Sequence, residues 1–133
     1  MMVKYVRDRG YKGAGMDPNL TLGKVYLVFG IVFRADFSNY PHQVIVESDA
    51  DLTPSLWELQ YFDLVDERVP EKWVFNAFKY FGVVDGYYQL CPVEFSGDFW
   101  DLFHDADAAA EKKFLSVKDS MEKFHVDGGS DLH

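Results

Sequence analysis

Cysteine is nearly absent from this sequence, since Cys91 is the only one. An internal disulfide is therefore impossible, and a chain without disulfides fits a reducing compartment. The first residues also lack the apolar run and the small-residue cleavage site of a signal peptide. We expect a cytoplasmic protein.

Long apolar runs are missing too. The most apolar stretch, "LTLGKVYLVFGIVF" at 20–33, is too short to cross a bilayer as a helix, and Lys24 and two glycines interrupt it. Its glycines match neither the GxxxxGK[ST] nor the GxGxxG spacing of phosphate-binding loops. The sequence therefore predicts neither a membrane segment nor a phosphate loop here.

Basic residues are scarce in the middle of the chain. Residues 1–35 carry a net charge of +4, residues 36–71 carry −8 with Arg68 as the single base, and residues 72–133 carry −5. A surface with that much negative charge repels nucleic acid and attracts cationic partners, although the charge can also serve solubility alone. We expect no nucleic-acid partner.

Apolar side chains, by contrast, are abundant in this chain of 133 residues, at 48% hydrophobic and 17% aromatic. That content suffices for one compact domain to bury a core without metal or disulfide staples. The segment Val25–Phe33 is apolar at both alternating sets of positions, which predicts a central strand with a bulge or bend at Gly30. Further strands are expected at 3–8 and 42–48, and a short helical turn followed by a strand at 55–66.

A joint is expected at Val69 and Pro70. Beyond it, residues 71–82 and 86–95 read as two strands, and a helix is expected near Asp107 to Phe124, with Asp105 or Asp107 as its cap. One stripe of this helix is apolar at spacings of three and four. Its members are Ala110, Phe114, Val117, Met121 and Phe124.

The predicted fold class is therefore α+β, with a curved antiparallel β-sheet or SH3-like partial barrel and a C-terminal α-helix packed on it. Residues 1–126 are expected to form this single domain, and residues 127–133 to be a frayed tail or a cloning remnant. Phe29 and Phe114 should both be buried. Truncating Phe114 to alanine should then cost about 3–5 kcal/mol of stability.

Candidate catalytic groups are few. Cys91 with one of the four histidines could act as a nucleophile, but its apolar strand favours a buried inert thiol. Asp101, His104 and Asp105 could ligate a divalent ion, but acidic residues at a helix start are more often caps. A pair of carboxylates for acid/base chemistry requires a separation that the sequence does not supply. We expect no enzyme, no catalytic residues, no metal and no cofactor.

The first half of the chain resembles small SH3-like β-barrels found in bacterial and phage genomes. The similar segments are "LTLGKVYLVFGI", "HQVIVESD" and "PSLWELQYFDLVD". With its extra strands and C-terminal helix, the whole chain resembles immunity proteins of bacterial polymorphic, Rhs and contact-dependent growth inhibition systems. This resemblance implies a small acidic protein that neutralises one cognate toxin domain, often a basic nuclease, by occluding its active site. A small metal-dependent hydrolase and a non-catalytic adaptor module remain alternatives.

The carboxylates of the acidic middle block are the candidate toxin contacts, because negative charge would complement a cationic cleft. If they are exposed turn charges, reversing Asp49 and Asp51 to lysine should leave folding intact. The oligomeric state is not indicated. The six candidates are Glu47, Asp49, Asp51, Asp66, Glu67 and Glu71.

Overall fold

The computed structural model describes residues 1–8, 18–34, 42–70, 72–78 and 86–130. The chain divides into two compact units, Met1–Val69 and Pro70–His133. Their boundary coincides with the joint predicted at Val69 and Pro70. The prediction of a single domain over 1–126 stays a prediction.

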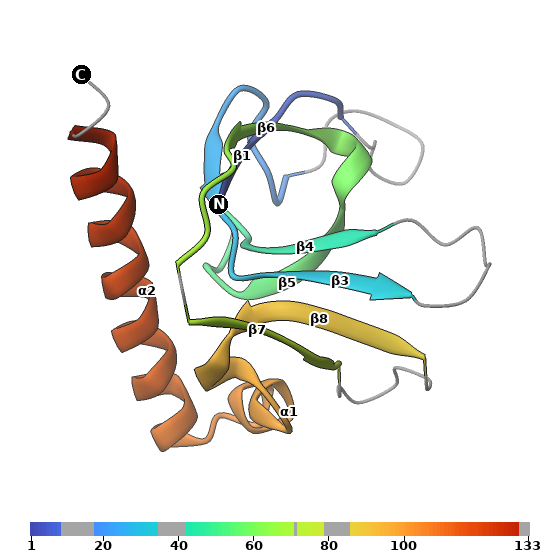
Figure 1. The fold of residues 1–133 in the computed structure, drawn as a ribbon. Coiled ribbons are helices and arrows are strands. Elements are labelled where there is room, and N and C mark those ends of the chain that lie inside the picture. The colour runs from blue at the N-terminus through green and yellow to red at the C-terminus, as the bar shows by residue number, and fades with distance from the viewer. Residues whose placement is uncertain (9–17, 35–41, 71, 79–85, 131–133) are drawn as a thin grey trace. The chain divides into compact units, whose positions relative to one another are not determined.

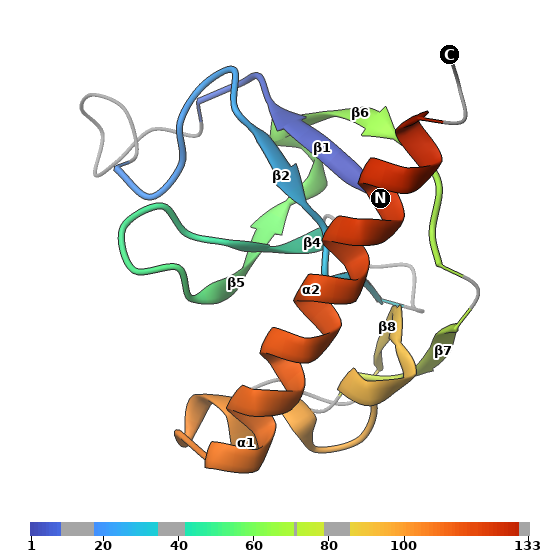
Figure 2. The same ribbon diagram turned by 90° about the vertical axis from the view of Figure 1, so that its left-hand side faces the viewer.

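Three strands of the first unit form an antiparallel sheet in which β1 (Met2–Tyr5) lies between β2 (Val25–Leu27) and β6 (Phe62–Asp66) (Figure 2). Val3 on β1 faces Tyr26 on one side and Leu64 on the other. Val3 and Tyr5 are fully buried, whereas Lys4 between them is exposed. One face of β1 therefore lies in the core, as the alternation of side chains along a strand requires.

The other strands of this unit are β3 (Gly30–Arg34), β4 (Gln43–Glu47) and β5 (Pro54–Glu58) (Figure 1). β4 pairs antiparallel with both of the others. Its three central residues, 44–46, are all buried, so both faces of the strand are covered. The strand predicted at 42–48 is confirmed.

The single strand predicted over Val25–Phe33 is wrong, because the segment is divided between β2 and β3. Val28 and Phe29 lie between these strands with no exposed surface, and their N–H groups donate to the carbonyls of Met1 and Ile45. The chain thus leaves one sheet and enters another inside the core. Both sets of alternating positions are apolar for this reason. The bend predicted at Gly30 lies one or two residues earlier, at Val28 and Phe29, and Gly30 is the first residue of β3.

The segment 55–66 contains more regular structure than its pattern indicates. A 3₁₀ turn, η1 (Leu59–Tyr61), precedes β6, which confirms the expected helical turn and strand. β5, however, already begins at Pro54 and was not predicted. Trp57 on β5 is buried and pairs with Val44, so tertiary packing decides this strand.

The second unit contains the β-hairpin of β7 (Trp73–Ala77) and β8 (Tyr87–Pro92), then η2 (Val93–Phe95), α1 (Phe99–His104) and α2 (Ala108–Ser130) (Figure 1). The Asp107 carboxylate accepts a hydrogen bond from the Ala110 N–H at 2.9 Å, so Asp107 caps α2 as one of the two predicted caps. Helix α2 continues past Val126 to Ser130, into the segment for which a frayed tail was expected.

Aromatic side chains dominate the core of the second unit. Phe95 stacks on Phe99 at 4.6 Å between ring centroids and on Phe114 at 5.8 Å, and Phe103 contacts Phe114 at 5.0 Å. The predicted stripe of α2 faces this core. Ala110, Phe114 and Met121 are buried, and Val117 and Phe124 are half-buried.

These elements make the protein α+β, with antiparallel sheets that are not closed and a C-terminal helix, as the sequence predicts. Phe29 and Phe114 are both buried, as the predicted fold requires. Within the residues described above, no helix is both long and apolar enough to cross a membrane.

Candidate functional site

Asp49, in the turn between β4 and β5, is held by three side chains. One carboxylate oxygen accepts a bond from Lys24 Nζ at 2.5 Å, and the other accepts bonds from Thr21 Oγ1 at 2.6 Å and the Tyr26 hydroxyl at 2.7 Å. The Tyr26 hydroxyl also accepts a bond from the Thr21 N–H at 2.8 Å. This cluster, the Asp49 network, joins the turn to β2 and to the residues before it.

The network also shifts the acidity of its members. Burial raises the pKa of Tyr26 to about 12, with the Asp49 charge acting in the same direction. Partial burial by itself raises the pKa of Asp49, but the bonds from Lys24, Thr21 and Tyr26 outweigh it and hold that pKa below its usual value. Asp49 therefore stays ionised at neutral pH.

Asp49 is consequently not an exposed turn charge, since only 19% of its side-chain surface is accessible. The expectation that reversal to lysine leaves folding intact was conditional on an exposed turn charge, and Asp49 does not meet that condition. A lysine would lose three hydrogen bonds and stand beside Lys24. Asp51, in contrast, is exposed and accepts a bond from the Thr53 N–H at 3.0 Å.

Asp66, at the end of β6, forms a two-pronged ion pair with Arg68. Its carboxylate oxygens accept bonds from Arg68 Nε at 2.9 Å and Nη2 at 2.5 Å. The two side chains are 17% and 29% exposed. Arg68 is the one base among residues 36–71, and it thus neutralises Asp66, one of the six candidate toxin contacts.

The six predicted contacts do not form one tight cluster. The Asp49 network adjoins Tyr5 at one end of β1, because the Tyr5 N–H donates to the Lys24 carbonyl, whereas Asp66 pairs with Met2 at the other end. Glu47 is half-buried at the end of β4, and Glu67 is exposed just after β6. Glu71 lies outside the described residues.

The sequence reasoning missed an exposed apolar pair on β6. Leu64 and Val65 are 55% and 53% exposed, and β6 is an edge strand of its three-stranded sheet. Asp63, beside them, is exposed and forms a 3.7 Å ion pair with Arg7. The signal in the sequence was the adjacent pair Leu64 and Val65 itself, since two adjacent apolar residues in a strand cannot both face the core.

Of the candidate catalytic groups, Cys91 is buried in the core, whereas His104 and Asp105 are exposed. Cys91 is fully buried, and burial raises its pKa to about 11, so the thiol stays protonated at neutral pH. The His104 ring contacts Phe103 and Trp100, and the resulting desolvation lowers its pKa, with Asp101 and Asp105 opposing the shift. In the part of the chain that the structure describes, no three histidine, cysteine or acidic side chains are grouped as metal ligands.

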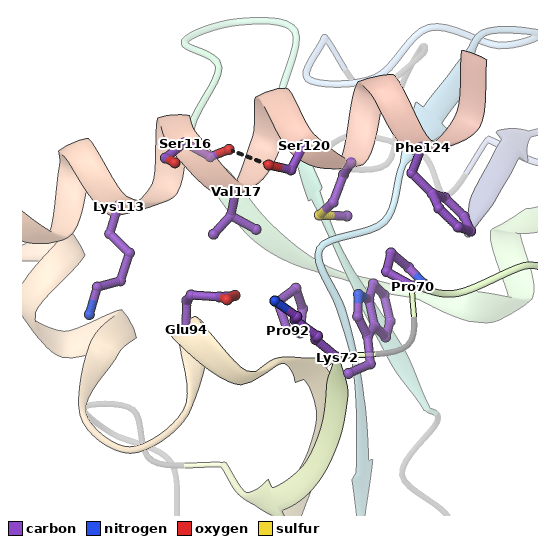
Figure 3. Close-up of a pocket in the computed structure, with 11 residues that line it drawn as sticks. Pro70, Lys72, Pro92, Glu94, Lys113, Ser116, Val117, Ser120 and Phe124 are labelled. Atoms are coloured by element: carbon purple, nitrogen blue, oxygen red, sulfur yellow. Dashed lines mark hydrogen bonds between the residues drawn. The ribbon is translucent and has the colours of Figure 1, made fainter. Parts of the chain in front are cut away.

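A cavity of about 580 Å³ lies in the second unit, between α2 and the ends of β7 and β8 (Figure 3). Its wall combines two lysines and a glutamate with aromatic, proline and aliphatic side chains. A volume of this size is typical of small-molecule sites. The lining residues are Pro70, Lys72, Trp73, Pro92, Glu94, Lys113, Ser116, Val117, Ser120, Met121 and Phe124.

One residue of the cavity wall, Trp73, contains a buried polar atom. Its indole Nε1–H is buried and has no hydrogen-bond partner among the described residues. A buried donor without an acceptor is costly, so such groups call for an explanation. The sequence pattern places Trp73 on a strand, and nothing local to this residue indicates a cavity.

Comparisons with known proteins give no further identification, because no protein-family model, no curated protein and no solved structure matches the chain.

Proposed function

We propose that this protein is an immunity protein, which binds a basic toxin domain and occludes its active site without catalysis. The observation that carries the proposal is the exposed edge of β6, where Leu64 and Val65 lie beside acidic side chains. Protein interfaces commonly have an apolar centre and a polar rim. We call this surface, made of residues 63–67, the β6 edge.

Charge supports a basic partner. The segment 36–71 carries a net charge of −8, and Asp63 and Glu67 are both exposed on the β6 edge. Negative charge spread over a surface speeds the encounter with a cationic protein, and the effect weakens as salt is added. Asp49 and Asp66 contribute to this field mainly at a distance, because each is largely buried against a cation, whereas the ion pair of Asp63 with Arg7 is open to solvent.

The free edge of β6 also supports an adaptor function as the second candidate. β6 pairs with β1 alone among the described strands, so its outer edge can accept an extended peptide by strand addition. An adaptor would bind a peptide and give no protection against a toxin. Growth protection therefore separates the two functions.

The test is a titration of the full chain against the toxin domain encoded beside it, at low and high salt, with growth protection scored in parallel. Leu64→Ser should weaken binding about tenfold or more if Leu64 is a central contact. Glu67→Lys should slow association severalfold at low salt and much less at high salt. Glu122→Lys on α2 is the matched control, because Glu122 is also exposed.

Equal effects of Glu67→Lys and Glu122→Lys would remove the β6 edge as the binding surface. Absence of both binding and protection with every neighbouring gene product would remove the immunity function itself. Binding of an extended peptide without protection would favour the adaptor.

A further inference from the structure

We propose that the turn between β4 and β5 is a second contact surface for the toxin domain, with Leu52 inserting into an apolar pocket of that domain. This inference rests on the proposed immunity function and adds to it a surface apart from the β6 edge. We call residues 48–53 the Leu52 turn. Figure 2 shows it projecting from the end of the β4–β5 hairpin.

Leu52 has a backbone conformation that leucine rarely adopts. Its φ is 58°, in the left-handed region, where a branched apolar side chain crowds the backbone. Hydrogen bonds hold this conformation, since the Leu52 N–H donates to the Ser48 carbonyl at 2.8 Å and the Ser48 N–H donates to the Thr53 carbonyl at 3.0 Å. Glycine or asparagine would fit this position with less strain.

The Leu52 side chain contributes little to the core, because 61% of the residue is exposed. A single exposed leucine is common on protein surfaces and by itself indicates nothing. An exposed leucine at a strained position is different, since neither burial nor backbone preference favours leucine there. Strained residues gather at binding sites, where the strain holds a side chain ready for its partner.

The Leu52 turn is fixed to the segment before β2. The Asp49 N–H donates to the Asn19 carbonyl at 2.7 Å, and the Ser48 hydroxyl donates to Asn19 Oδ1 at 3.2 Å. These bonds add to those of the Asp49 carboxylate within the Asp49 network. A turn held in this way presents Leu52 in one conformation, so covering it with a partner costs little conformational entropy.

Tyr26 connects the Leu52 turn to the start of β6. Its hydroxyl lies 2.7 Å from the Asp49 carboxylate, and its ring centroid lies 6.5 Å from that of Phe62, the residue before Asp63. Stable interfaces use about 20–30 residues of each partner, far more than the β6 edge contains. A toxin domain on the β6 edge therefore needs further contacts, and the Leu52 turn adjoins the end of β6 at which Asp63 lies.

Charge favours the same cationic partner at both surfaces. Asp51, directly before Leu52, is exposed, and the segment 36–71 carries a net charge of −8. Lys24 adds little positive charge, because it is paired with Asp49. Basic side chains around the toxin's pocket would complement Asp51 while the pocket itself takes the leucine.

The test measures two quantities on the same full-chain variants, the melting temperature and the affinity for the toxin domain encoded beside this gene, with growth protection in parallel. Leu52→Asn should raise the melting temperature by about 2–6 °C, because asparagine tolerates the left-handed conformation. It should also weaken toxin binding about five- to thirtyfold, because the apolar contact is lost. Leu52→Met keeps both the strain and an apolar side chain, so its affinity should stay within about threefold of the parent.

Two substitutions in the second unit are the matched controls. Leu115→Gln removes a leucine of nearly the same exposure, 63%. Ala106→Gly relieves strain at a residue with a φ of 60°. Ala106→Gly should raise the melting temperature, and both variants should leave the toxin affinity unchanged. A more stable fold with weaker binding would then be specific to Leu52.

Parental affinity in Leu52→Asn would overturn the Leu52 contact and leave the immunity function standing. So would equal weakening by Leu52→Asn and Leu115→Gln, or a fall in the melting temperature of Leu52→Asn, which would show that the leucine serves the fold. Absence of binding and protection by the parent itself would remove the immunity function and this contact with it.

Discussion

The Asp49 carboxylate and the Tyr26 hydroxyl are 2.7 Å apart, and this bond connects the β4–β5 turn to β2. Tyr26 is only 5% exposed, so its hydroxyl depends on partners within the fold. A turn that looks like a string of solvated charges thus contains a carboxylate with a structural role. The acidic block combines such carboxylates with others that are open to a partner.

Replacing Asp49 with asparagine should reduce stability by about 1–3 kcal/mol at pH 7, since hydrogen bonds to a charged group are lost. The pKa of Asp49 is lowered in the fold, so its contribution is present above the unfolded value near 4 and is lost as the pH falls through the folded value. Denaturant melts at pH 7 and at about pH 2 should show the difference between Asp49→Asn and the parent shrinking with acid. A difference that is equal at both pH values would contradict the network.

Gln89→Leu should destabilise the protein by about 2–4 kcal/mol, because several buried polar groups would lose their partner at once. The Gln89 amide donates to Asn76 Oδ1 at 2.9 Å and to the Phe95 carbonyl at 3.2 Å, and it accepts from Trp100 Nε1 at 3.3 Å. Urea melts measure the loss. Gln60→Leu, at an exposed position, is the control and should change stability by less than about 0.5 kcal/mol.

Phe114→Ala should cost about 3–5 kcal/mol, as expected for a large cavity in an aromatic core. Phe114 is 3% exposed and contacts the rings of Phe95 and Phe103. Leu115→Ala is the matched control on the exposed face of the same helix, where 63% of the residue is accessible. A loss below about 1 kcal/mol for Phe114→Ala would show that α2 does not cover this core.

Ala106→Gly should stabilise the protein by about 0.5–1 kcal/mol. Ala106, between α1 and α2, has a φ of 60°, a left-handed conformation that costs alanine energy and glycine none. Ala109→Gly, in the first turn of α2, should instead destabilise by about 1 kcal/mol. Thermal melts of the two variants should therefore move in opposite directions, and movement in the same direction would argue against the strain.

Periodic patterns in the sequence predicted the helix well and most strands, because those patterns report burial of one face. The stripe from Ala110 to Phe124 and the cap at Asp107 depend on residues within a few turns of each other. The prediction of one strand over Val25–Phe33 was wrong because the apolar pattern of this segment does not report burial of one face. Its apolar residues serve two sheets, and sequence spacing cannot tell one strand buried on both faces from a chain passing between sheets.

The sequence by itself determined the α+β class, the joint at Val69 and Pro70, the acidic middle block and the apolar surroundings of Cys91. Only the tertiary structure decided which carboxylates are engaged, because Lys24 and Asp49 are distant in sequence and lie next to strands of two different sheets. It also decided that Leu64 and Val65 are exposed, since that depends on β6 being an edge strand. The tertiary structure also leaves the Trp73 indole N–H without an acceptor among the described residues, because the partners of a buried group come from residues that are distant in sequence.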